Sequence, residues 1–314
     1  MNQSVVVFIK RLFLFMALLI VADNIIGYGL ETIYFGQKKG QFAQTTFSID
    51  NTTQDILIFG SSRAVRHYSP NVLSKALNMS CYNVGRDAQS LPYYAAMQEA
   101  IFTRYKPKMI IVDVNNWELA PGEAKYEKLS ILLPYYRHHP ELAPYLKQSG
   151  QWEGIKLLSR TYPYNSSLFI LAYNFLFANK LIADEHGFAP LTGKMTSAML
   201  DDYASRLKLN SQASAESDKI IDRKALNYYR QFLANTNTHN IKTYVVISPK
   251  VLKEPLDARN KLLKKIAQEY PNVKFIDFSD DKDYNMMYGK FADVFHLNNE
   301  GAEEFTRDLI PFLN

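Results

Sequence analysis

The stretch Asp55-Ile-Leu-Ile-Phe-Gly-Ser-Ser-Arg63 decides how this chain can fold. Asp55 leads into an apolar run of β-branched and aromatic side chains, which is typical of a buried strand. Gly60 interrupts that run, and Ser61 and Ser62 follow at the junction between a strand and a helix. The stretch therefore predicts the first unit of an α/β fold, with a hydroxyl group at the carboxyl end of a strand.

The remainder of the chain repeats this pattern of short apolar runs and longer helix-like segments. Such alternation is typical of βαβ units and predicts a parallel sheet. The expected strands are Asp55–Phe59, Cys81–Val84, Met109–Val114, Thr243–Ile247 and Val273–Phe278. The expected helices are Pro70–Leu77, Pro92–Tyr105, Asp222–Ala234 and Leu256–Tyr270.

One region, from about Glu118 to Ser217, departs from this rhythm and is rich in aromatic residues. It contains Tyr135-Tyr136, Trp152 and Tyr162-Pro-Tyr164. We expect a helical insertion over the sheet, following a central strand, where open α/β sheets bind ligands.

The N-terminal residues predict a membrane segment. Lys10 and Arg11 precede an apolar run, and the stretch Leu12–Leu30 has about the 20 residues that a spanning helix needs. We expect a cytoplasmic N-terminus at 1–11, a signal-anchor at 12–30, a polar tether at 31–53 and the main domain at 54–314. A cleaved signal peptide and a buried N-terminal helix are the alternatives. The basic residues ahead of the run favour a single-pass protein with its large domain outside the cytoplasm.

Composition narrows the function classes. The 314 residues suffice for one large domain or two small ones. The net charge is +5, and the basic residues are scattered, so we expect no nucleic-acid surface. Cys81 is the single cysteine, which excludes an intramolecular disulfide, and we expect it to be buried in a strand.

A second motif, Phe291-Ala-Asp-Val-Phe-His-Leu-Asn298, precedes a helix-like stretch near the C-terminus. A serine hydroxyl becomes a nucleophile when a base lies within hydrogen-bond reach and a third group orients that base. Ser62, His296 and Asp293 are the candidates for these three roles. We expect His67 on the surface of the first helix. His138-His139 and His186 lack the spacing of a metal site, so we expect no metal and no cofactor.

Four short blocks make the chain resemble the SGNH (GDSL-like) hydrolase superfamily from Asp55 to the C-terminus. Gly60-Ser61-Ser62 resembles the nucleophile block, Asn83-Val-Gly85 the second block, and Asp293-x-x-His296 the last. Asp113-Val-Asn-Asn116 resembles the third block but lacks its glycine. The resemblance implies a flavodoxin-like three-layer sandwich around a central parallel sheet.

The resemblance also implies an activity. Ser62 would be the nucleophile, and the oxyanion would be held by Ser62, Gly85 and Asn115, with Asn116 as the second choice for the amide. With its membrane segment, the chain looks most like the branch related to DltD and to acyltransferases of exported polysaccharide. The expected function is hydrolysis or transfer of an O-acyl group, with acetyl as one candidate, on a cell-envelope glycan, with a membrane-bound acyltransferase as a candidate partner. The alternatives are a secreted lipase or esterase and a catalytically inactive glycan-binding or assembly subunit.

Overall fold

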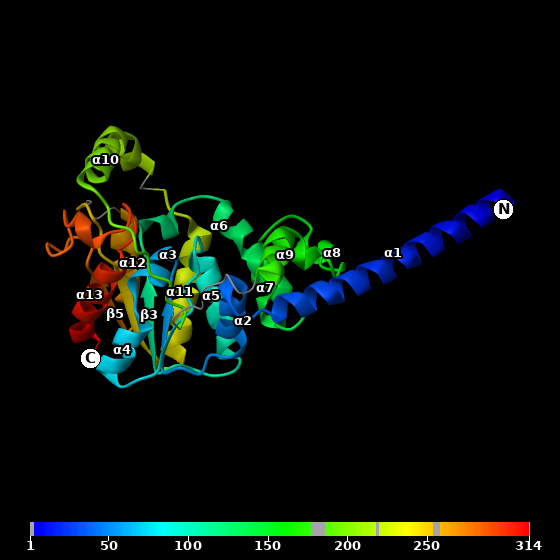
Figure 1. Cartoon of the computed structure of the whole chain (residues 1–314), viewed down its shortest axis with the longest axis horizontal. Coiled ribbons are helices and arrows are strands. Elements are labelled where there is room, and N and C mark those ends of the chain that lie inside the picture. The colour runs from blue at the N-terminus through cyan, green and yellow to red at the C-terminus, as the bar shows by residue number, and fades with distance from the viewer. Residues whose placement is uncertain (1–2, 178–185, 218–219, 254–257, 314) are drawn as a thin grey trace. The chain divides into compact units, whose positions relative to one another are not determined.

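The computed structural model describes residues 3–177, 186–217, 220–253 and 258–313, and its chain divides into two compact units (Figure 1). Unit 1 comprises Met1–Thr46 and Leu129–Ala183. Unit 2 comprises Phe47–Lys128 and Asp184–Asn314. The main domain expected at 54–314 stays a prediction.

Unit 2 contains a parallel sheet of five strands in the order β2-β1-β3-β4-β5. This is the order of a flavodoxin-like doubly wound sheet. All five expected strands are present, and their bounds differ from the expected ones by a single residue. The α/β fold class is therefore confirmed. The strands are β1 (Ile56–Phe59), β2 (Cys81–Asn83), β3 (Met109–Asp113), β4 (Lys242–Ile247) and β5 (Val273–Asp277).

Helices cover both faces of this sheet. Ile56 and Ile58 point to one face, where they share a buried core with α3 (Ser62–His67), α4 (Pro70–Leu77) and α13 (Asn299–Leu309). On the other face, Phe59 contacts Phe232 edge to face with ring centroids 5.2 Å apart. Phe232 belongs to α11 (Arg223–Thr238), which packs against α5 (Leu91–Phe102). Side chains alternate along a strand, so each strand contributes to both cores.

Capping residues set several helix boundaries. Asp222 lies just before α11 and accepts hydrogen bonds from the N–H groups of Lys224 and Ala225 at 3.0 and 3.1 Å. It is therefore the N-cap and not the first helical residue. The helix expected at Leu256–Tyr270 is α12 (Ala258–Ala267), and its expected start at Leu256 lies outside the described residues. Cys81 is a buried free thiol, as expected.

The expected insertion contains helices and 3-10 turns in both units, whereas its residues 186–196 form turns, bridges and irregular chain. Its elements are η1 (Asn116–Leu119), α6 (Ala124–Glu127), η2 (Lys128–Tyr135), η3 (Pro140–Leu142), α7 (Ala143–Leu146), α8 (Glu153–Lys156), η4 (Tyr162–Ser167), α9 (Leu168–Leu176) and α10 (Ser197–Ser217). Two further 3-10 turns, η6 (Tyr288–Lys290) and η7 (Ile310–Phe312), lie near the C-terminus.

The N-terminal segment forms α1 (Gln3–Phe35), which contains the expected span and is longer at both ends. It is long and apolar enough to cross a membrane, and none of its most apolar 18-residue window is buried. The alternative of a buried N-terminal helix is therefore wrong. The choice between an anchor and a cleaved signal stays a prediction.

The segment expected as a tether is largely helical. Residues 31–35 complete α1, and α2 (Gly40–Asp50) follows after a short turn. Tyr34 and Phe42 are buried, and the Tyr34 ring lies 5.0 Å from that of Phe42 and 5.8 Å from that of Tyr135. Such aromatic contacts stabilise the fold through burial of large apolar surface. A few widely spaced aromatic residues do not produce a readable period, which is why the pattern suggested a tether.

Candidate active site

The turn after β1 requires glycine. Gly60 has a φ of +149°, and a Cβ at this position would come within 2.6 Å of the Ala64 Cβ and 3.1 Å of the Asp113 Cβ. Only glycine adopts this conformation without strain and leaves room for both neighbours. The turn makes Ser61 the N-cap and Ser62 the first residue of α3, at the carboxyl end of the central strands.

The structure brings the three candidate catalytic residues together. The Ser62 Oγ lies 2.8 Å from the Nε2 of His296. The Nδ1 of His296 lies 3.0 Å from each carboxylate oxygen of Asp293. All three side chains are half-buried, so they are ordered by their neighbours and still reachable from solvent. This is the arrangement of nucleophile, base and orienting carboxylate that serine catalysis uses.

A tight turn positions the base. Phe291 and Leu297 are fully buried on either side of it and form an antiparallel bridge, and the N–H of Ala292 donates to the carbonyl of His296 at 2.9 Å. Within the turn, the Asp293 Oδ1 accepts the backbone N–H of His296 at 3.0 Å. The buried ends hold the turn, and the hydrogen bonds inside it hold the carboxylate against the imidazole.

The Asp293 carboxylate is suited to orienting the imidazole. Partial burial raises the pKa of Asp293, but hydrogen bonds from the His296 side chain and the Phe295 N–H outweigh burial, so the pKa lies below its usual range. An ionised Asp293 accepts a hydrogen bond from the protonated Nδ1 of His296. The lone pair of Nε2 is then left to accept the Ser62 hydroxyl proton. The tautomer that general-base chemistry needs follows from this contact.

Of the residues expected at the oxyanion hole, Gly85 lies close to the helix of Ser62, since a Cβ on Gly85 would come within 2.9 Å of the Ala64 Cβ. The N–H of Arg86 donates to the Gly60 carbonyl at 3.0 Å, so the loop after β2 lies against the Gly60 turn. The Gly85 N–H donates to the Asn83 Oδ1 at 3.0 Å. As the first helical residue, Ser62 has an N–H with no acceptor within its own helix.

Asn115, the expected oxyanion amide, follows β3 and is buried. Its Oδ1 accepts the Trp117 N–H at 2.8 Å and caps η1. Its Nδ2 makes no hydrogen bond within the described part of the chain, so this donor remains available to a substrate oxygen. Asn116, the second choice, is the first residue of η1 and is half-buried.

A buried polar network lies next to these residues, and the sequence reasoning missed it. The expectation that His67 lies on the surface is wrong, because its side chain is fully buried. Its Nδ1 lies 3.0 Å from the Oγ of Ser248, and its Nε2 accepts the N–H of Leu297 at 3.1 Å. Arg63 also donates to the Ser248 Oγ, through Nε at 3.0 Å and Nη2 at 2.8 Å. Ser248 follows β4 directly. A polar residue immediately after an expected strand was therefore the sequence signal that could have pointed to this network.

This network joins the helix of Ser62 to the turn of His296. Leu297 follows His296 directly, so its N–H ties the base to His67, which ends α3. Burial lowers the pKa of His67 well below its usual range, and the charge of Arg63 adds to this effect. His67 is therefore neutral, with its proton on Nδ1 and its Nε2 free to accept from Leu297.

Asp113 extends the network under the sheet edge. Its Oδ2 accepts the Tyr68 hydroxyl at 2.7 Å and the Ser248 N–H at 3.3 Å, and the Arg63 Nε lies 3.7 Å from its Oδ1. Burial raises the pKa of Asp113, although the charge of Arg63 and the hydrogen bonds oppose this shift. Hydrogen bonds therefore satisfy Oδ2, whereas the buried Oδ1 has the charge of Arg63 nearby but accepts no hydrogen bond within the described part of the chain.

Part of the insertion borders the His296 turn within unit 2. The N–H of Met195 donates to the Phe291 carbonyl at 2.8 Å, and the ring of Tyr203 in α10 lies 5.9 Å from that of Phe295. Phe295 and Trp117 are exposed aromatic residues that adjoin or closely follow site residues in the chain, with 50% and 72% of their surfaces accessible. Aromatic faces of this kind can stack against a substrate.

Two further histidines, His138 and His139, pair with carboxylates. The Nε2 of His138 lies 2.6 Å from Glu31, and the Nδ1 of His139 lies 2.8 Å from Glu141. Among the described residues, no group of three or more histidine, cysteine or acidic side chains gathers as metal ligands would.

Comparisons with known proteins leave the family open. No protein-family model matches the sequence, and no curated protein matches it. One solved structure that matches is a protein provisionally described as a platelet activating factor from Streptococcus pneumonia, with 10% identity, a TM-score of 0.42, and coverage of 97% of this chain and 99% of that one. A likeness at this level supports no conclusion about function, so the functional argument rests on the residues themselves.

Proposed function

We propose that this protein is a serine-dependent esterase or O-acyltransferase of SGNH type. The single observation that carries the proposal is the 2.8 Å contact between the Ser62 Oγ and the His296 Nε2, with the Nδ1 of the same ring held 3.0 Å from Asp293. A hydroxyl, a base and an orienting carboxylate in this order activate serine toward an ester carbonyl.

The reaction would proceed in two halves. His296 takes the proton of the Ser62 hydroxyl as Oγ attacks the ester carbonyl, and the C–O bond to the leaving alcohol then breaks while His296 returns the proton to that alcohol. The resulting acyl-Ser62 is attacked by water or by a sugar hydroxyl, whose proton passes through His296 in the same way. Water gives an esterase, and a sugar hydroxyl gives a transferase.

Three donors are proposed for the oxyanion, namely the N–H groups of Ser62 and Gly85 and the side-chain amide of Asn115, with Asn116 as the second choice. Removal of one such donor typically costs about 2.7–4 kcal/mol of barrier. The free Nδ2 of Asn115 supports its part. The Gly85 N–H would have to be shared between the oxyanion and the Asn83 Oδ1.

The proposed setting is the cell envelope. The apolar α1 supports a single-pass anchor, and Lys10 and Arg11, which precede the apolar run from Leu12 within this helix, favour a large domain outside the cytoplasm. An acylated glycan at the cell surface is the proposed substrate, with an acetyl ester as the first candidate and a membrane-bound acyltransferase as a candidate donor of the acyl group.

Protease added outside intact cells tests the proposed orientation. It should digest the domain beyond Gln44 and leave the N-terminal stub protected. Full protection of the domain would contradict the orientation.

Labelling with a fluorophosphonate tests the catalytic proposal. The wild type should be labelled on Ser62, and Ser62→Ala should not be labelled at all. Ser61→Ala is the matched control, because Ser61 is the adjacent hydroxyl and is also half-buried. Equal labelling of wild type and Ser62→Ala would move the nucleophile elsewhere.

A second candidate is a glycan-binding or assembly subunit without catalysis. It is favoured by the engagement of two oxyanion groups, since the Gly85 N–H donates to Asn83 and the Asn115 Oδ1 caps η1. A folded wild type that resists fluorophosphonate and hydrolyses no ester would favour this candidate.

Product analysis separates transfer from hydrolysis. The enzyme is supplied with an acyl donor and candidate acceptor oligosaccharides, and acylated sugar is counted against free acid by mass spectrometry. We expect acylated sugar, with slow hydrolysis as a side reaction, because residues of the insertion border the His296 turn and water exclusion favours a bound acceptor. Fast hydrolysis with free acid as the sole product would indicate a plain carbohydrate esterase. Separately, release of the mature protein by cleavage near Ala22 would indicate a secreted esterase.

A further inference from the structure

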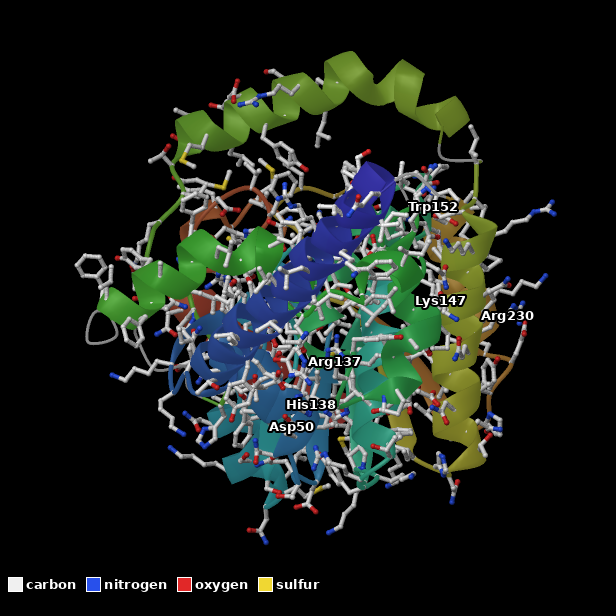
Figure 2. The ribbon with its side chains drawn as sticks, turned by 90° about the vertical axis from the view of Figure 1, so that its right-hand side faces the viewer. Asp50, Arg137, His138, Lys147, Trp152 and Arg230 are labelled. Carbon is white, nitrogen blue, oxygen red and sulfur yellow. The ribbon has the colours of Figure 1, made fainter. Side chains whose placement is uncertain are left out.

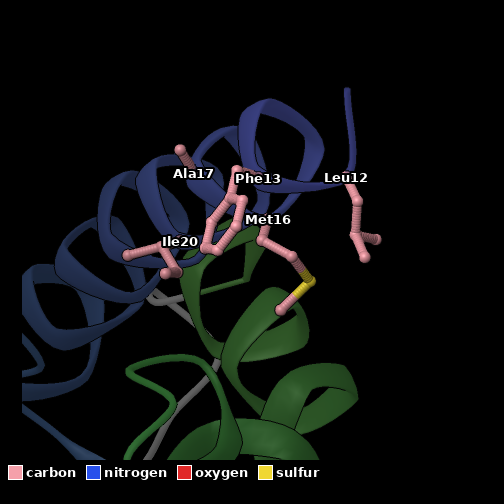
Figure 3. Close-up of a pocket in the computed structure, with 5 residues that line it drawn as sticks. All are labelled: Leu12, Phe13, Met16, Ala17 and Ile20. Carbon is pink, nitrogen blue, oxygen red and sulfur yellow. The ribbon is translucent and has the colours of Figure 1, made fainter. Parts of the chain in front are cut away.

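The two halves of α1 differ in what surrounds them. From Gln3 to Ala22 the helix is exposed, apart from the half-buried Val6 and Ile9. The part of this exposed half that follows Lys10 and Arg11, Leu12–Ala22, is uncharged and spans about 16 Å, roughly half the hydrocarbon core of a bilayer. Figure 3 shows the apolar side chains that line a hollow on this half, all of them from α1 itself: Leu12, Phe13, Met16, Ala17 and Ile20.

The second half of α1 is docked within unit 1. The Asp23 carboxylate accepts the hydroxyl of Ser159 at 2.7 Å, that of Thr161 at 2.6 Å and the N–H of Arg160 at 2.7 Å. One turn on, a Cβ on Gly27 would come within 2.3 Å of the Arg160 Cβ, so glycine is needed for this close approach. The chain around residue 160 therefore meets α1 at the point where its exposed half ends.

Large apolar side chains surround this point and face outward. They lie in and around α8 and in α9, and their accessible fractions are 70% for Trp152, 62% for Ile155, 79% for Leu158, 92% for Phe169, 51% for Tyr173, 68% for Phe175 and 70% for Leu176. We call these seven residues the interfacial surface. The helix α9 carries no charged residue, and only Leu171 and Asn174 of its side chains are buried. Soluble proteins rarely expose so many apolar residues together without a partner.

The interfacial surface is continuous with the exposed half of α1. Leu158 precedes Ser159, which binds Asp23, and α9 packs against both α1 and η4. Figure 1 shows α8 at the end of unit 1 toward which the exposed half of α1 projects, and α9 running crosswise to α1. Figure 2 views the molecule from that side and labels Trp152.

We propose that the interfacial surface lies in the headgroup region of the bilayer that α1 crosses. Tryptophan and tyrosine favour this region, and an uncharged helix lying crosswise to a spanning helix presents its apolar side to the acyl chains. We choose a lipid surface as the partner because α1, as the proposed anchor, places the interfacial surface at the boundary of the membrane. The inference rests on the proposed anchor and not on the proposed catalysis.

Quenching of tryptophan fluorescence by brominated lipids tests it, because the chain has two tryptophans. The full chain carrying Trp117→Phe, so that Trp152 is its sole tryptophan, is reconstituted into phosphatidylcholine vesicles. We expect Trp152 to be quenched more by lipids brominated near the headgroup than by lipids brominated near the chain end. Adding Leu158→Glu and Phe169→Glu, at two exposed positions, should reduce this quenching, whereas Met286→Glu, at an exposed position of unit 2, should not.

A second reporter separates failure of the inference from failure of the anchor. Leu18→Trp, in a chain with Trp117→Phe and Trp152→Phe, places the sole tryptophan inside the uncharged, exposed run Leu12–Ala22. Deep quenching at position 18 without quenching of Trp152 would overturn the interfacial surface and leave a protein partner as its occupant. Absence of quenching at both positions would overturn the anchor and the inference together.

Discussion

Two clusters in unit 2 each contain a serine, a histidine and an aspartate, and they differ in exposure. In the open cluster of Ser62, His296 and Asp293, every side chain is half-buried, and one imidazole nitrogen faces a hydroxyl that a substrate can reach. The buried cluster is made of Ser248, His67 and Asp113, whose accessible fractions are 0%, 0% and 1%.

The comparison shows that residue type does not decide the role of a histidine. His67 has both nitrogens engaged, by Ser248 and by the Leu297 N–H, and burial keeps it neutral. It can hold the fold but cannot accept a proton from a substrate. His296 is held on one side by Asp293 and keeps the other nitrogen for chemistry. The open cluster has the geometry that the proposed reaction needs, and the buried cluster is hydrogen-bonded to the residue that follows His296.

The largest effect should come from the open cluster. Ser62→Ala and His296→Ala should each lower kcat/KM for p-nitrophenyl acetate by at least about a thousandfold, because a nucleophile and its base act as a unit. Asp293→Asn should retain more activity than His296→Ala, since it disturbs orientation without removing the base. Steady-state kinetics on folded variants measure this. Comparable activity in Ser62→Ala and wild type would show that Ser62 is not the nucleophile.

A smaller effect is expected from the buried cluster. His67→Phe removes the acceptor of the Leu297 N–H, and an unsatisfied buried donor costs about 1–3 kcal/mol of unfolding free energy. Loss of this hydrogen bond should also displace the adjacent His296. We expect kcat to fall by roughly ten- to a hundredfold, because small misplacements of a catalytic group have effects of this size. Urea unfolding and kinetics measure both quantities.

The conservative variant separates positioning from stability. In His67→Gln the side-chain oxygen can accept the Leu297 N–H, so this variant should recover part of the lost kcat. If His67→Gln and His67→Phe lose kcat equally, while both stay folded, hydrogen bonding by His67 does not position the base.

A third prediction concerns a buried carboxyl whose pKa moves opposite to that of Asp293. Burial raises the pKa of Glu118 to about 8, although hydrogen bonds from Tyr94 and from the Leu91 N–H oppose the shift. A raised carboxyl pKa means that the folded state holds a proton that the unfolded state releases above about 4.5. The stability that depends on this proton is therefore fully present below pH about 4.5 and is lost as the pH rises to about 8.

Denaturant unfolding between pH 5 and 8 measures this effect. The contribution of Glu118 should fall by roughly 1.4 kcal/mol per pH unit, and Glu118→Gln should remove that slope. An identical slope in Glu118→Gln and wild type would show that Glu118 is ionised in the folded protein.

The smallest effect is expected at the exposed rim of the open cluster. Trp117→Ala should raise KM for an acylated oligosaccharide by a few-fold and leave turnover of p-nitrophenyl acetate unchanged, because the ring can only stack on the larger substrate. Trp152→Ala is the matched control, since Trp152 is 70% accessible and Trp117 is 72% accessible. An equal effect of both variants would remove the argument for a sugar-binding role.

Local pattern was sufficient for the sheet and for the candidate residues. Strand residues such as those of Ile56–Phe59 are buried on both faces, so they form continuous apolar runs, and the turn after β1 needs the glycine that marks it in the sequence. Ser62 follows this glycine closely, and the Asp293-x-x-His296 motif precedes a helix-like stretch. Both could therefore be chosen as candidates from the sequence, before the structure showed their contact.

Pattern failed where a role depends on residues far apart in the chain. His67 lies five residues after Ser62 on a short helix, and nothing in that spacing reveals Ser248 or Leu297, which reach it from β4 and from the His296 turn. The helix α2 escaped for the same reason, because Tyr34, Phe42 and Tyr135 bury one another only after the chain has folded. Sequence by itself determined the strands, the membrane-length apolar helix and the reactive residue types, because those properties depend on neighbouring residues. The tertiary structure alone decided which histidine is open and which is buried, because burial and hydrogen-bond partners come from segments that only folding brings together.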